Sequence, residues 1–306
     1  MFGFLARRII WTVPVLLGIC VVVFLVVALI PGDAVGAMMA QVKLPPEQMA
    51  VLRRQLGLDQ SIPVRLWHYL TDLARLDLGR SFFGYHPVGK LIKDNFPATL
   101  QLTVAAMFVA TLIGLPFGIL AAVKHNTAYD LGGMTIALLG ISVPGFWLGL
   151  MMIQLFSVQL GWLPITGRGG LLPLIMPAVA LGVAESAVLA RLTRASLLEV
   201  MREDYVRTAR AKGLAPRKVI FRHALRGALI PVLTMFGMQF GTLIGGAVII
   251  ENVFARQGLG TLVTNAVINR DAPVVQGVVL VAATMYVLVN LIVDALYAFI
   301  DPRIRY

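Results

Sequence analysis

Six long stretches of apolar residues alternate with shorter polar segments along the chain. A helix of about 20 residues crosses the hydrocarbon core of a bilayer, which is about 30 Å thick, at a rise of about 1.5 Å per residue. Each stretch reaches roughly this length, so the pattern predicts an all-α integral membrane protein with six transmembrane helices. The expected spans are approximately Ile9–Ile30, Ala98–Val123, Leu131–Leu160, Leu171–Ala190, Ala228–Ile250 and Val274–Ile300. The third and sixth are long enough to tilt or to extend beyond the lipid.

The first stretch has a second interpretation, a cleaved signal peptide. Its apolar run exceeds the about 7–15 residues usual for such peptides, and Pro31-Gly32-Asp33 follows where a small-residue cleavage site would stand. We therefore expect an anchored helix. The predicted organisation is a helix over residues 1–30, an extracytoplasmic segment over 31–97, a core domain over 98–300 and a tail over 301–306.

Composition supports a membrane location. Hydrophobic residues make up 58% of the chain and charged residues 13%, whereas soluble domains carry about 25% charged residues. The net charge of +11 would suggest nucleic-acid binding in a soluble protein. Here topology explains it, because Lys and Arg accumulate in cytoplasmic loops, and we expect no nucleic-acid partner. Cys20 is the only cysteine, which excludes an intrachain disulfide.

The basic residues also predict orientation. Ten Lys and Arg residues lie in the segment Arg191–Arg226, which we call the basic loop. Others flank the first and last stretches, at Arg7, Arg8, Arg303 and Arg305, whereas the short loops of the opposite side hold only Arg168, Arg256 and Arg270. Both termini and the basic loop are therefore expected in the cytoplasm.

The segment over residues 31–97 contains two patterns typical of short amphipathic helices. One begins at Pro45-Pro46-Glu47 and stops at Gly57, and the other begins at Pro63 and carries Leu66, Trp67, Leu70 and Leu73 at helical spacing. These helices are expected to lie on the membrane surface or to cap the bundle. Simple packing explains them equally well.

Known catalytic motifs are missing from the sequence. Gly84–Lys90 resembles a phosphate-binding loop, but Leu91 stands where Ser or Thr would bind magnesium, and no apolar strand precedes it. The four histidines, His68, His86, His125 and His223, form no metal-binding motif. We expect no catalytic residue, no metal and no directly bound cofactor, which argues against a membrane-embedded enzyme.

Polar and flexible residues within the spans are candidates for a translocation path. Glu185 lies in a helix of small residues, and an ionisable group at membrane depth is by default a functional candidate. Met235, Met238 and Gln239 lie in the fifth stretch, where thioethers and an amide suit a permissive path. An interhelical hydrogen bond explains Glu185 at least as well as a path does, and core filling is the better explanation for the residues of the fifth stretch.

The fifth stretch also carries a repeated spacing of glycines. Gly237, Gly241 and Gly245 recur every four residues. Such small-residue rows let two helix backbones approach closely in lipid, so they predict tight helix packing.

The basic loop reads as a helix, a break at Gly213 and a second basic helix that re-enters the membrane. The charge rule alone explains a basic loop, but Gly213 with Ala209 and Ala211 adds small residues that permit close docking. If the chain were a purely structural membrane scaffold, a glycine within a basic helical loop would have no explanation. The pattern favours a rigid projection that transmits force from a cytosolic partner.

This loop resembles the EAA motif of ABC importer permeases, with Arg207-Thr208-Ala209 at the place of Glu-Ala-Ala and Gly213 as the glycine. His223 and Arg226 depart from the general consensus, and the form found here is similar to the dipeptide and oligopeptide branch. The resemblance to that branch extends along nearly the whole chain, and it is carried further by Arg7–Asp33, Leu160–Pro164, Arg270–Gln276 and Asp301–Tyr306. The loop Ala255–Gly260 lacks a proline often found there.

The resemblance implies a permease of the bacterial inner membrane that pairs with a second homologous permease, two ATP-binding subunits and an extracytoplasmic substrate-binding protein. ATP and Mg²⁺ would be used by the partner subunits. The coupling residues implied are Thr208, Ala209, Arg210, Ala211, Lys212, Gly213, Arg217, Arg222 and His223. Dipeptides or oligopeptides are the expected substrates, with glutathione, a nickel complex or another small solute as alternatives.

Overall fold

The computed structural model describes residues 2–32, 34–39, 45–167 and 170–300. The chain folds into helices, and within these ranges extended pairing is limited to one isolated bridge between Arg80 and Pro87. The predicted all-α class is confirmed. The elements are α1 (Phe2–Leu29), α2 (Ala34–Met39), α3 (Pro46–Gln55), α4 (Ile62–Ala74), α5 (Val88–Val123), α6 (Ala128–Ser142), α7 (Gly145–Met152), η1 (Ile153–Gln159), α8 (Leu172–Val200), α9 (Asp204–Ala211), α10 (Pro216–Lys218), η2 (Val219–Ala224), α11 (Leu225–Val253), α12 (Leu259–Ile268) and α13 (Ala272–Ile300).

Five continuous helical segments of the described chain are long and apolar enough to cross a membrane, in the positions expected for the first, second, fourth, fifth and sixth stretches. The third stretch differs from the single long helix predicted. It is a pair, Ala128–Ser142 and Gly145–Gln159, bent by 93°. Val143 adopts an extended conformation (ψ 118°) before Pro144, because a proline ring disfavours the helical region in the residue that precedes it.

The chain divides into two compact units, and the boundaries fall within α5 and α13. The core unit consists of residues 100–256 with 288–306 and the first four residues. The peripheral unit consists of residues 5–99 and 257–287. The tail over 301–306, with Arg303 and Arg305, lies outside the described residues, as does Arg168. The predicted division between residues 1–30 and 31–97 stays a prediction.

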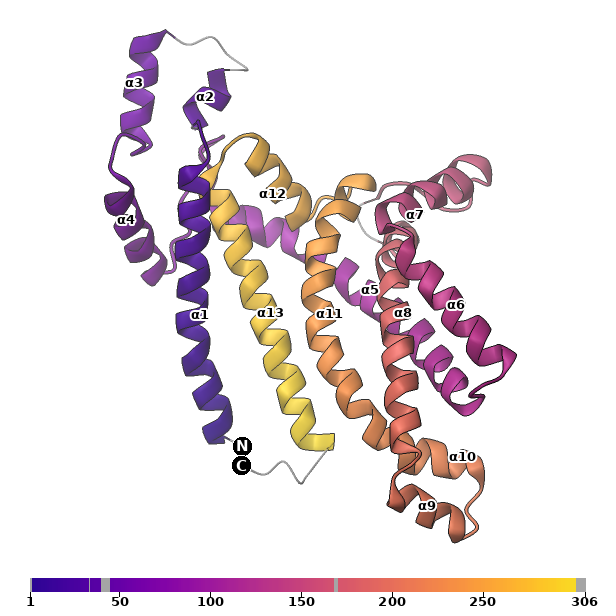
Figure 1. The fold of residues 1–306 in the computed structure, drawn as a ribbon. Helices are drawn as coiled ribbons and strands as arrows, with labels where there is room; N and C mark the ends of the chain where they lie inside the picture. The colour runs from indigo at the N-terminus through magenta and orange to yellow at the C-terminus, as the bar shows by residue number, and fades with distance from the viewer. Residues whose placement is uncertain (1, 33, 40–44, 168–169, 301–306) are drawn as a thin grey trace. The chain divides into compact units, whose positions relative to one another are not determined.

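Close approach of small residues organises the core unit. A Cβ atom added to Gly114 or Gly118 of α5 would lie 2.6 or 2.5 Å from a backbone carbonyl oxygen of α8, and one added to Gly182 of α8 would lie 2.5 Å from the Ala106 carbonyl. Helices α8 and α11 also pack along each other, with Ala180 and Ala247 buried in a shared cluster (Figure 1). Backbones this close leave no room for a larger side chain at the three glycines.

The peripheral unit has a separate apolar core and a polar anchor. Val88 and Ile92 at the start of α5 pack with Leu259 of α12 and Val274 of α13. The Ser81 hydroxyl donates a 2.5 Å hydrogen bond to the buried carboxylate of Asp271, which also accepts one from a backbone N–H at 3.1 Å. These bonds hold the segment before α5 against the start of α13.

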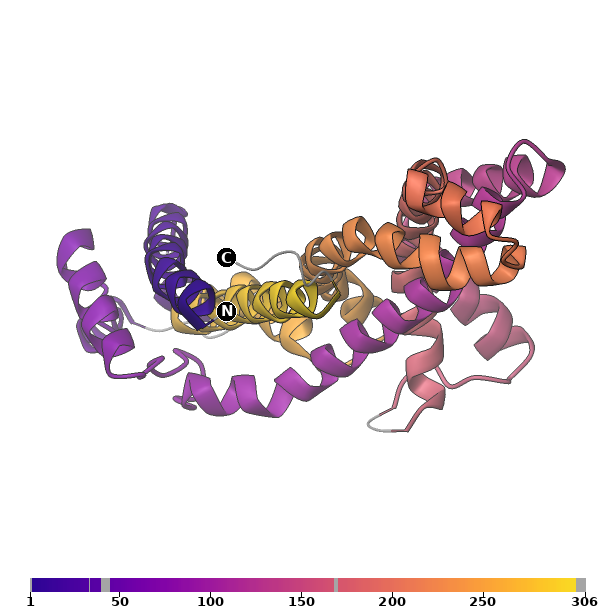
Figure 2. The same ribbon diagram turned by 90° about the horizontal axis from the view of Figure 1, so that it is seen from below.

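Both amphipathic helices predicted between residues 31 and 97 are present as α3 and α4. Helix α3 begins at Pro46, and α4 carries Pro63 in its first turn, where a missing N–H costs nothing. Helix α4 lies beside the half of α1 that ends at Leu29 (Figures 1 and 2).

Candidate functional site

The first helix of the basic loop, α9, ends in a well-defined turn. Helix α9 stops at Ala211, and Gly213 adopts a left-handed conformation with φ of +72°. The Gly213 N–H bonds the Arg210 carbonyl at 2.9 Å, and the Leu214 N–H bonds the Ala209 carbonyl at 3.4 Å. This pairing is the Schellman motif, in which glycine is favoured because it has no Cβ to clash. The break predicted at Gly213 is therefore a conformational requirement, and no atom outside its neighbours lies within 4 Å of a Cβ built there.

The side of the basic loop that packs against α5 and α8 is a closed apolar core. Val206 and Ala209 of α9 pack with Val219 and Ala224 of η2 and with Leu197 of α8, and all five are buried. Ala122 at the end of α5 belongs to the same cluster. Because the loop shares its core with α5 and α8, it is packed firmly against the ends of those helices.

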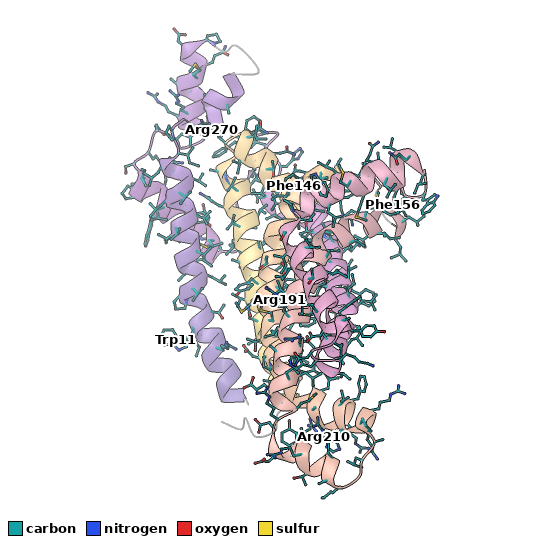
Figure 3. The ribbon with its side chains drawn as sticks, turned by 45° about the vertical axis from the view of Figure 1, so that its right-hand side comes forward. Trp11, Phe146, Phe156, Arg191, Arg210 and Arg270 are labelled. Carbon is teal, nitrogen blue, oxygen red and sulfur yellow. The ribbon has the colours of Figure 1, made fainter. Side chains whose placement is uncertain are left out.

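The opposite side of the loop is exposed and positively charged. Arg207 has 73% of its side chain exposed, and its contact with Asp204 at 3.6 Å is fully on the surface. The other exposed coupling candidates are Thr208, Arg210, Ala211, Lys212, Arg217 and Arg222, whereas His223 is half-buried and Ala209 is buried. Figure 3 shows Arg210 at the tip of the projecting loop. The predicted coupling residues thus divide into an exposed, mostly basic set that includes Gly213, a half-buried His223, and Ala209, which is buried in the supporting core.

Two aromatic side chains add apolar area to this surface. Tyr205 is 49% exposed and Phe221 is 55% exposed. A Cβ atom on Gly227 would lie 2.8 Å from the Tyr205 hydroxyl, so Tyr205 packs against the start of α11. Burial raises the pKa of the Tyr205 phenol, and the nearby Glu203 carboxylate adds to the effect. The hydroxyl therefore stays neutral at physiological pH.

The second helix of the basic loop is not a regular α-helix. Residues Val219–Ala224 form a π-helical turn that continues directly into α11. Together with α10 they make one helical segment, Pro216–Val253. The basic loop and the apolar helix α11 are therefore parts of the same rod, as the sequence predicted for a helix that re-enters the membrane.

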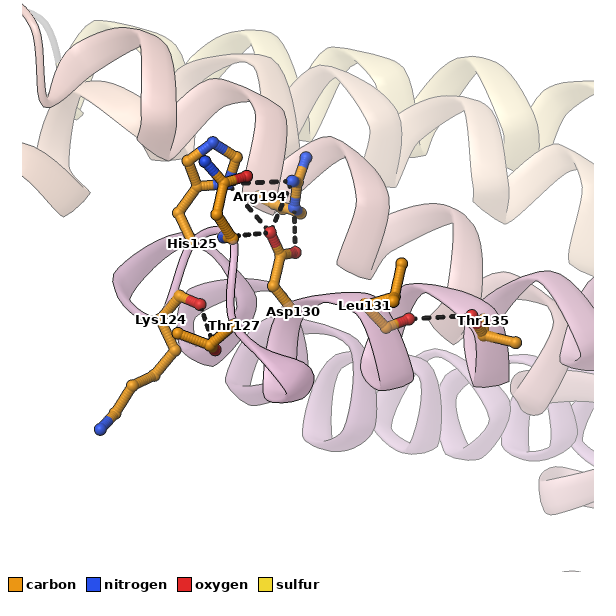
Figure 4. A network of polar contacts seen from close by, with 8 residues as sticks. Lys124, His125, Thr127, Asp130, Leu131, Thr135 and Arg194 are labelled. Carbon is orange, nitrogen blue, oxygen red and sulfur yellow. Dashed lines mark hydrogen bonds and ion pairs between the residues drawn. The ribbon is translucent and has the colours of Figure 1, made fainter.

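A buried ion pair lies between α6 and α8 (Figure 4). Arg194 donates from Nε to Asp130 Oδ1 at 2.5 Å and from Nη2 to Asp130 Oδ2 at 2.8 Å. Asp130 is 4% exposed and also contacts His125 Nδ1 at 2.9 Å and the Asn126 N–H at 3.0 Å. The network fixes the turn between α5 and α6 to α8, near the apolar core of the basic loop.

Sequence reasoning missed this network and treated His125 as isolated. Asp130 and Arg194 are 64 positions apart, so no local pattern joins them. The available signal was an acid at the start of a predicted span, opposite an arginine at the end of another.

The candidates for a translocation path lie on α8 and α11. The Gln239 side-chain amide is buried and donates a 2.9 Å hydrogen bond to the Glu185 backbone carbonyl, while Gln239 Oε1 has no hydrogen-bond partner among the described residues. The side chain of Glu185 is half-buried, as is that of Met235. Met238 is 55% exposed. The structure brings Glu185 and Gln239 together, and it places Met238 on a different side of α11 from Gln239.

The three glycines of α11 have different surroundings. A Cβ on Gly237 would lie 2.6 Å from Asn290 Oδ1 of α13, so this glycine permits close packing. Gly241 is half-buried. Gly245 is exposed, with open space around it, whereas the adjacent Gly246 faces Leu181 of α8 at 2.8 Å. Within this chain, tight packing is thus seen at Gly237, and Gly245 remains open.

Comparison with known proteins identifies two matching families. The profile described as "Binding-protein-dependent transport system inner membrane component" matches residues 114–306, and that described as "Binding-prot-dependent transport system membrane comp, N-term" matches residues 1–103.

Curated relatives match along the whole chain. The glutathione transport system permease protein GsiC of Salmonella choleraesuis (strain SC-B67) is 45% identical over 100% of both chains. The di/tripeptide transport system permease protein DppB of Pseudomonas aeruginosa (strain UCBPP-PA14) is 44% identical over 100% of this chain and 99% of its own.

Among solved structures, a chain of the MetNI methionine ABC transporter in an inward-facing conformation matches with a TM-score of 0.60 and 23% identity. The match covers 69% of this chain and 96% of that one. This likeness concerns the fold.

Proposed function

The chain belongs to the inner-membrane permeases of binding-protein-dependent ABC importers, and from this premise we propose that it forms half of the translocation path of an importer for small peptides. It is a multi-pass transport subunit, and we propose that ATP hydrolysis, with its Mg²⁺, takes place in partner ATPase subunits.

The basic loop carries this proposal. A projecting helical hairpin with a basic, partly aromatic surface and a rigid apolar base is suited to docking in a groove of another protein. ATP binding would close the ATPase dimer and draw the basic loops of the two permeases together. Because α11 continues from η2 without a break, this displacement would reach the membrane span directly and open the path outward. Hydrolysis would then reset it.

The assembly that we propose contains this chain, a second homologous permease, two ATP-binding subunits and an extracytoplasmic substrate-binding protein. The basic loop and both termini would lie in the cytoplasm, since Lys and Arg concentrate there. The segment over residues 31–97 would dock or seal against the binding protein on the opposite side.

Peptides are the substrate that we favour, because the relatives include a permease named for di- and tripeptides. Glutathione is the second candidate, because a relative of equal length and similar identity is named for it. Both molecules are short and peptide-like, and Glu185 and Met235, which are half-buried on α8 and α11, are the candidates that could face either substrate. Uptake of labelled dialanine and glutathione in a strain that lacks other importers distinguishes them.

Purification of the tagged chain from its native membrane tests the assembly. Two ATPases and a second permease are expected in the purified complex by mass spectrometry. Recovery of the chain alone would contradict the proposal.

A matched pair of variants at Gly213 tests the basic loop. Asn and Asp both tolerate the left-handed conformation, so Gly213→Asn and Gly213→Asp differ mainly in charge. We expect Gly213→Asp to abolish uptake while the complex still assembles, because a carboxylate is placed among the docking cations. Gly213→Asn should keep most of the uptake. Normal uptake by Gly213→Asp would exclude the loop from coupling, and equal loss in both variants would assign the effect to conformation.

A further inference from the structure

Helix α4 of the peripheral unit has three chemically distinct faces. The first packs on α1: the Tyr69 ring stacks on Phe24 with centroids 5.6 Å apart and an angle of 21°. The Tyr69 hydroxyl also interacts with the Cys20 thiol, and Cys20 is 2% exposed. These contacts fix both the position and the rotation of α4 along α1.

The second face of α4 is polar and lines a cavity. Arg65, His68 and Asp72 share this side of the helix and border a cavity of about 410 Å³. The cavity is completed by Gln60 and Gln276, among others. The charged groups of α4 thus face a hollow large enough to hold water.

The third face is apolar, and the described residues leave most of it uncovered. Pro63, Trp67, Leu70 and Ala74 recur at helical spacing and form what we call the Trp67 face. Trp67 is 68% exposed, Pro63 and Ala74 are exposed as well, and Leu70 is half-buried. Just beyond the helix, Leu76 is 90% exposed in a left-handed conformation with φ of +61°. In water, a large apolar side chain at this position would be unfavourable for two reasons, its exposure to solvent and the strain of its backbone.

The depth of α4 along α1 identifies what lies against this face. Phe24 and Cys20 precede Leu29, the end of the apolar span Ile10–Leu29, by five and nine residues. At about 1.5 Å per residue, their contacts with Tyr69 lie roughly 7 and 14 Å from that end, whereas half of a hydrocarbon core measures about 15 Å. The exposed side chains Val22 and Val26 of α1, at 60% and 55%, occupy the same depth and continue the apolar surface.

We propose that α4 is embedded in the half of the bilayer at the Leu29 end of α1, with the Trp67 face in contact with lipid acyl chains. Its polar face then borders a water-filled pocket within the protein. Helix α4 is thereby a partial membrane element that enters the lipid without crossing it. An irregular or charged segment is tolerated at such depth where it lines a protein cavity, as Arg65, His68 and Asp72 do.

Site-directed spin labelling of the complete transporter in lipid nanodiscs tests this assignment. Cys20→Ser removes the only native thiol of this chain while it keeps a hydroxyl beside Tyr69, and Trp67→Cys or His68→Cys then introduces the label into a complex whose partner subunits carry no accessible cysteine. Collisions with oxygen, which concentrates in lipid, should exceed collisions with a water-soluble nickel complex at position 67 and fall below them at position 68. Val22→Cys on α1 provides the lipid-facing reference.

Two results at position 67 would overturn the assignment. Preference for the nickel complex would place the face in water. Shielding from both reagents would place it against a protein partner, such as the binding protein or the second permease.

A measurement that keeps the native tryptophan avoids any loss of folding in Trp67→Cys. In the purified chain reconstituted into lipid as the variant Trp11→Phe/Trp147→Phe/Trp162→Phe, Trp67 is the remaining tryptophan, and we expect lipids brominated on the acyl chain to quench most of its fluorescence. Unchanged fluorescence in brominated lipid would also overturn the proposal.

Discussion

Two helices of this protein, α9 in the basic loop and α4 in the peripheral unit, end with the same backbone turn. In α9 the left-handed residue is Gly213, with φ of +72°. In α4 it is Leu76, with φ of +61°, and the Leu73 and Asp72 carbonyls accept the same pair of hydrogen bonds, at 2.9 and 3.0 Å. The turn therefore does not decide which residue occupies it.

The surroundings of the two helices account for the difference. Helix α9 lies on a closed apolar core and exposes cations, so its outer surface is suited to a protein partner. Helix α4 is held through Tyr69 and exposes apolar side chains at the depth of a transmembrane helix. A leucine in a strained, exposed position is tolerable where lipid replaces water. Under our two proposals, the same local turn would serve a protein interface in one unit and a lipid interface in the other.

The largest effect is expected from damage to the core beneath α9. Val206→Asp places a carboxylate at a site that is 0% exposed, where the described structure offers no cation in the surrounding cluster. We expect a loss of about 3–5 kcal/mol in the free energy of unfolding, because an uncompensated buried charge is strongly destabilising. SDS titration of the purified chain in mixed micelles measures it. Arg207→Asp is the control, because Arg207 is the next residue and lies on the exposed side of α9, and it should leave stability nearly unchanged. Similar losses in both variants would contradict the division of the loop into a buried apolar side and an exposed side.

A smaller effect on stability is expected from substitution of a glycine at which two helix backbones lie close together, compared with a glycine that has open space around it. A methyl group at Gly118 would lie 2.5 Å from the Ala190 carbonyl, while Gly245 has open space. Gly118→Ala should lower the free energy of unfolding by about 1–3 kcal/mol through overpacking, and Gly245→Ala should not lower it. The same SDS titration compares the pair. Equal stability of the two variants would show that α5 and α8 separate at little cost.

The two helix ends should respond with opposite signs. Gly213→Ala is expected to lower the free energy of unfolding by about 1 kcal/mol, because an L side chain is strained at positive φ. Leu76→Gly should raise it by up to about 1 kcal/mol in detergent, where the strain is relieved and the greater freedom of glycine in the unfolded chain offsets part of the gain. Measurement of both by SDS titration sharpens the comparison. Destabilisation by Leu76→Gly would mean that the leucine side chain contributes more than its backbone strain costs.

The smallest effect concerns the ion pair on the surface of α9. Arg207→Gln removes the 3.6 Å contact with Asp204, in which both side chains are largely exposed. Exposed pairs contribute little because water and salt screen them. Stability should be unchanged in SDS titration, whereas uptake should decline if Arg207 contacts the ATPase. A loss of stability would show that the pair orders α9.

The positions of the membrane-spanning helices could be predicted from hydropathy, because a helix that contacts lipid needs a long apolar run. The break of the third span at Pro144 was visible in the sequence as a proline followed by Gly145, yet the apolar run continues through it, and length alone predicted one helix. The turn at Gly213 was predictable because glycine is the residue that adopts positive φ most easily.

The rest depends on contacts between distant segments. The Asp130–Arg194 pair joins two helices through side chains that no periodicity connects. The regular glycine spacing of α11 proved uninformative about which glycine packs within the chain, since Gly237 faces Asn290 while Gly245 faces open space. Helix orientation, which decides this, is set by packing against neighbours and is not encoded in the spacing itself.

The π-helical turn at Val219–Ala224 determines how the helical segment that joins the basic loop to α11 tolerates the gain or loss of a residue. Each wide turn closes with an i to i+5 hydrogen bond and so holds one residue more than an α-helical turn. The extra residue sits between the docking surface and the membrane span, and the wide turn accommodates it while the two flanking segments keep nearly the same relative rotation. In regular α-helix, by contrast, removal of one residue swings everything beyond it by about 100° around the axis. The wide turn is thus the place in this rod where a change of one residue can be absorbed, whereas a deletion within α11 would misdirect an otherwise intact surface.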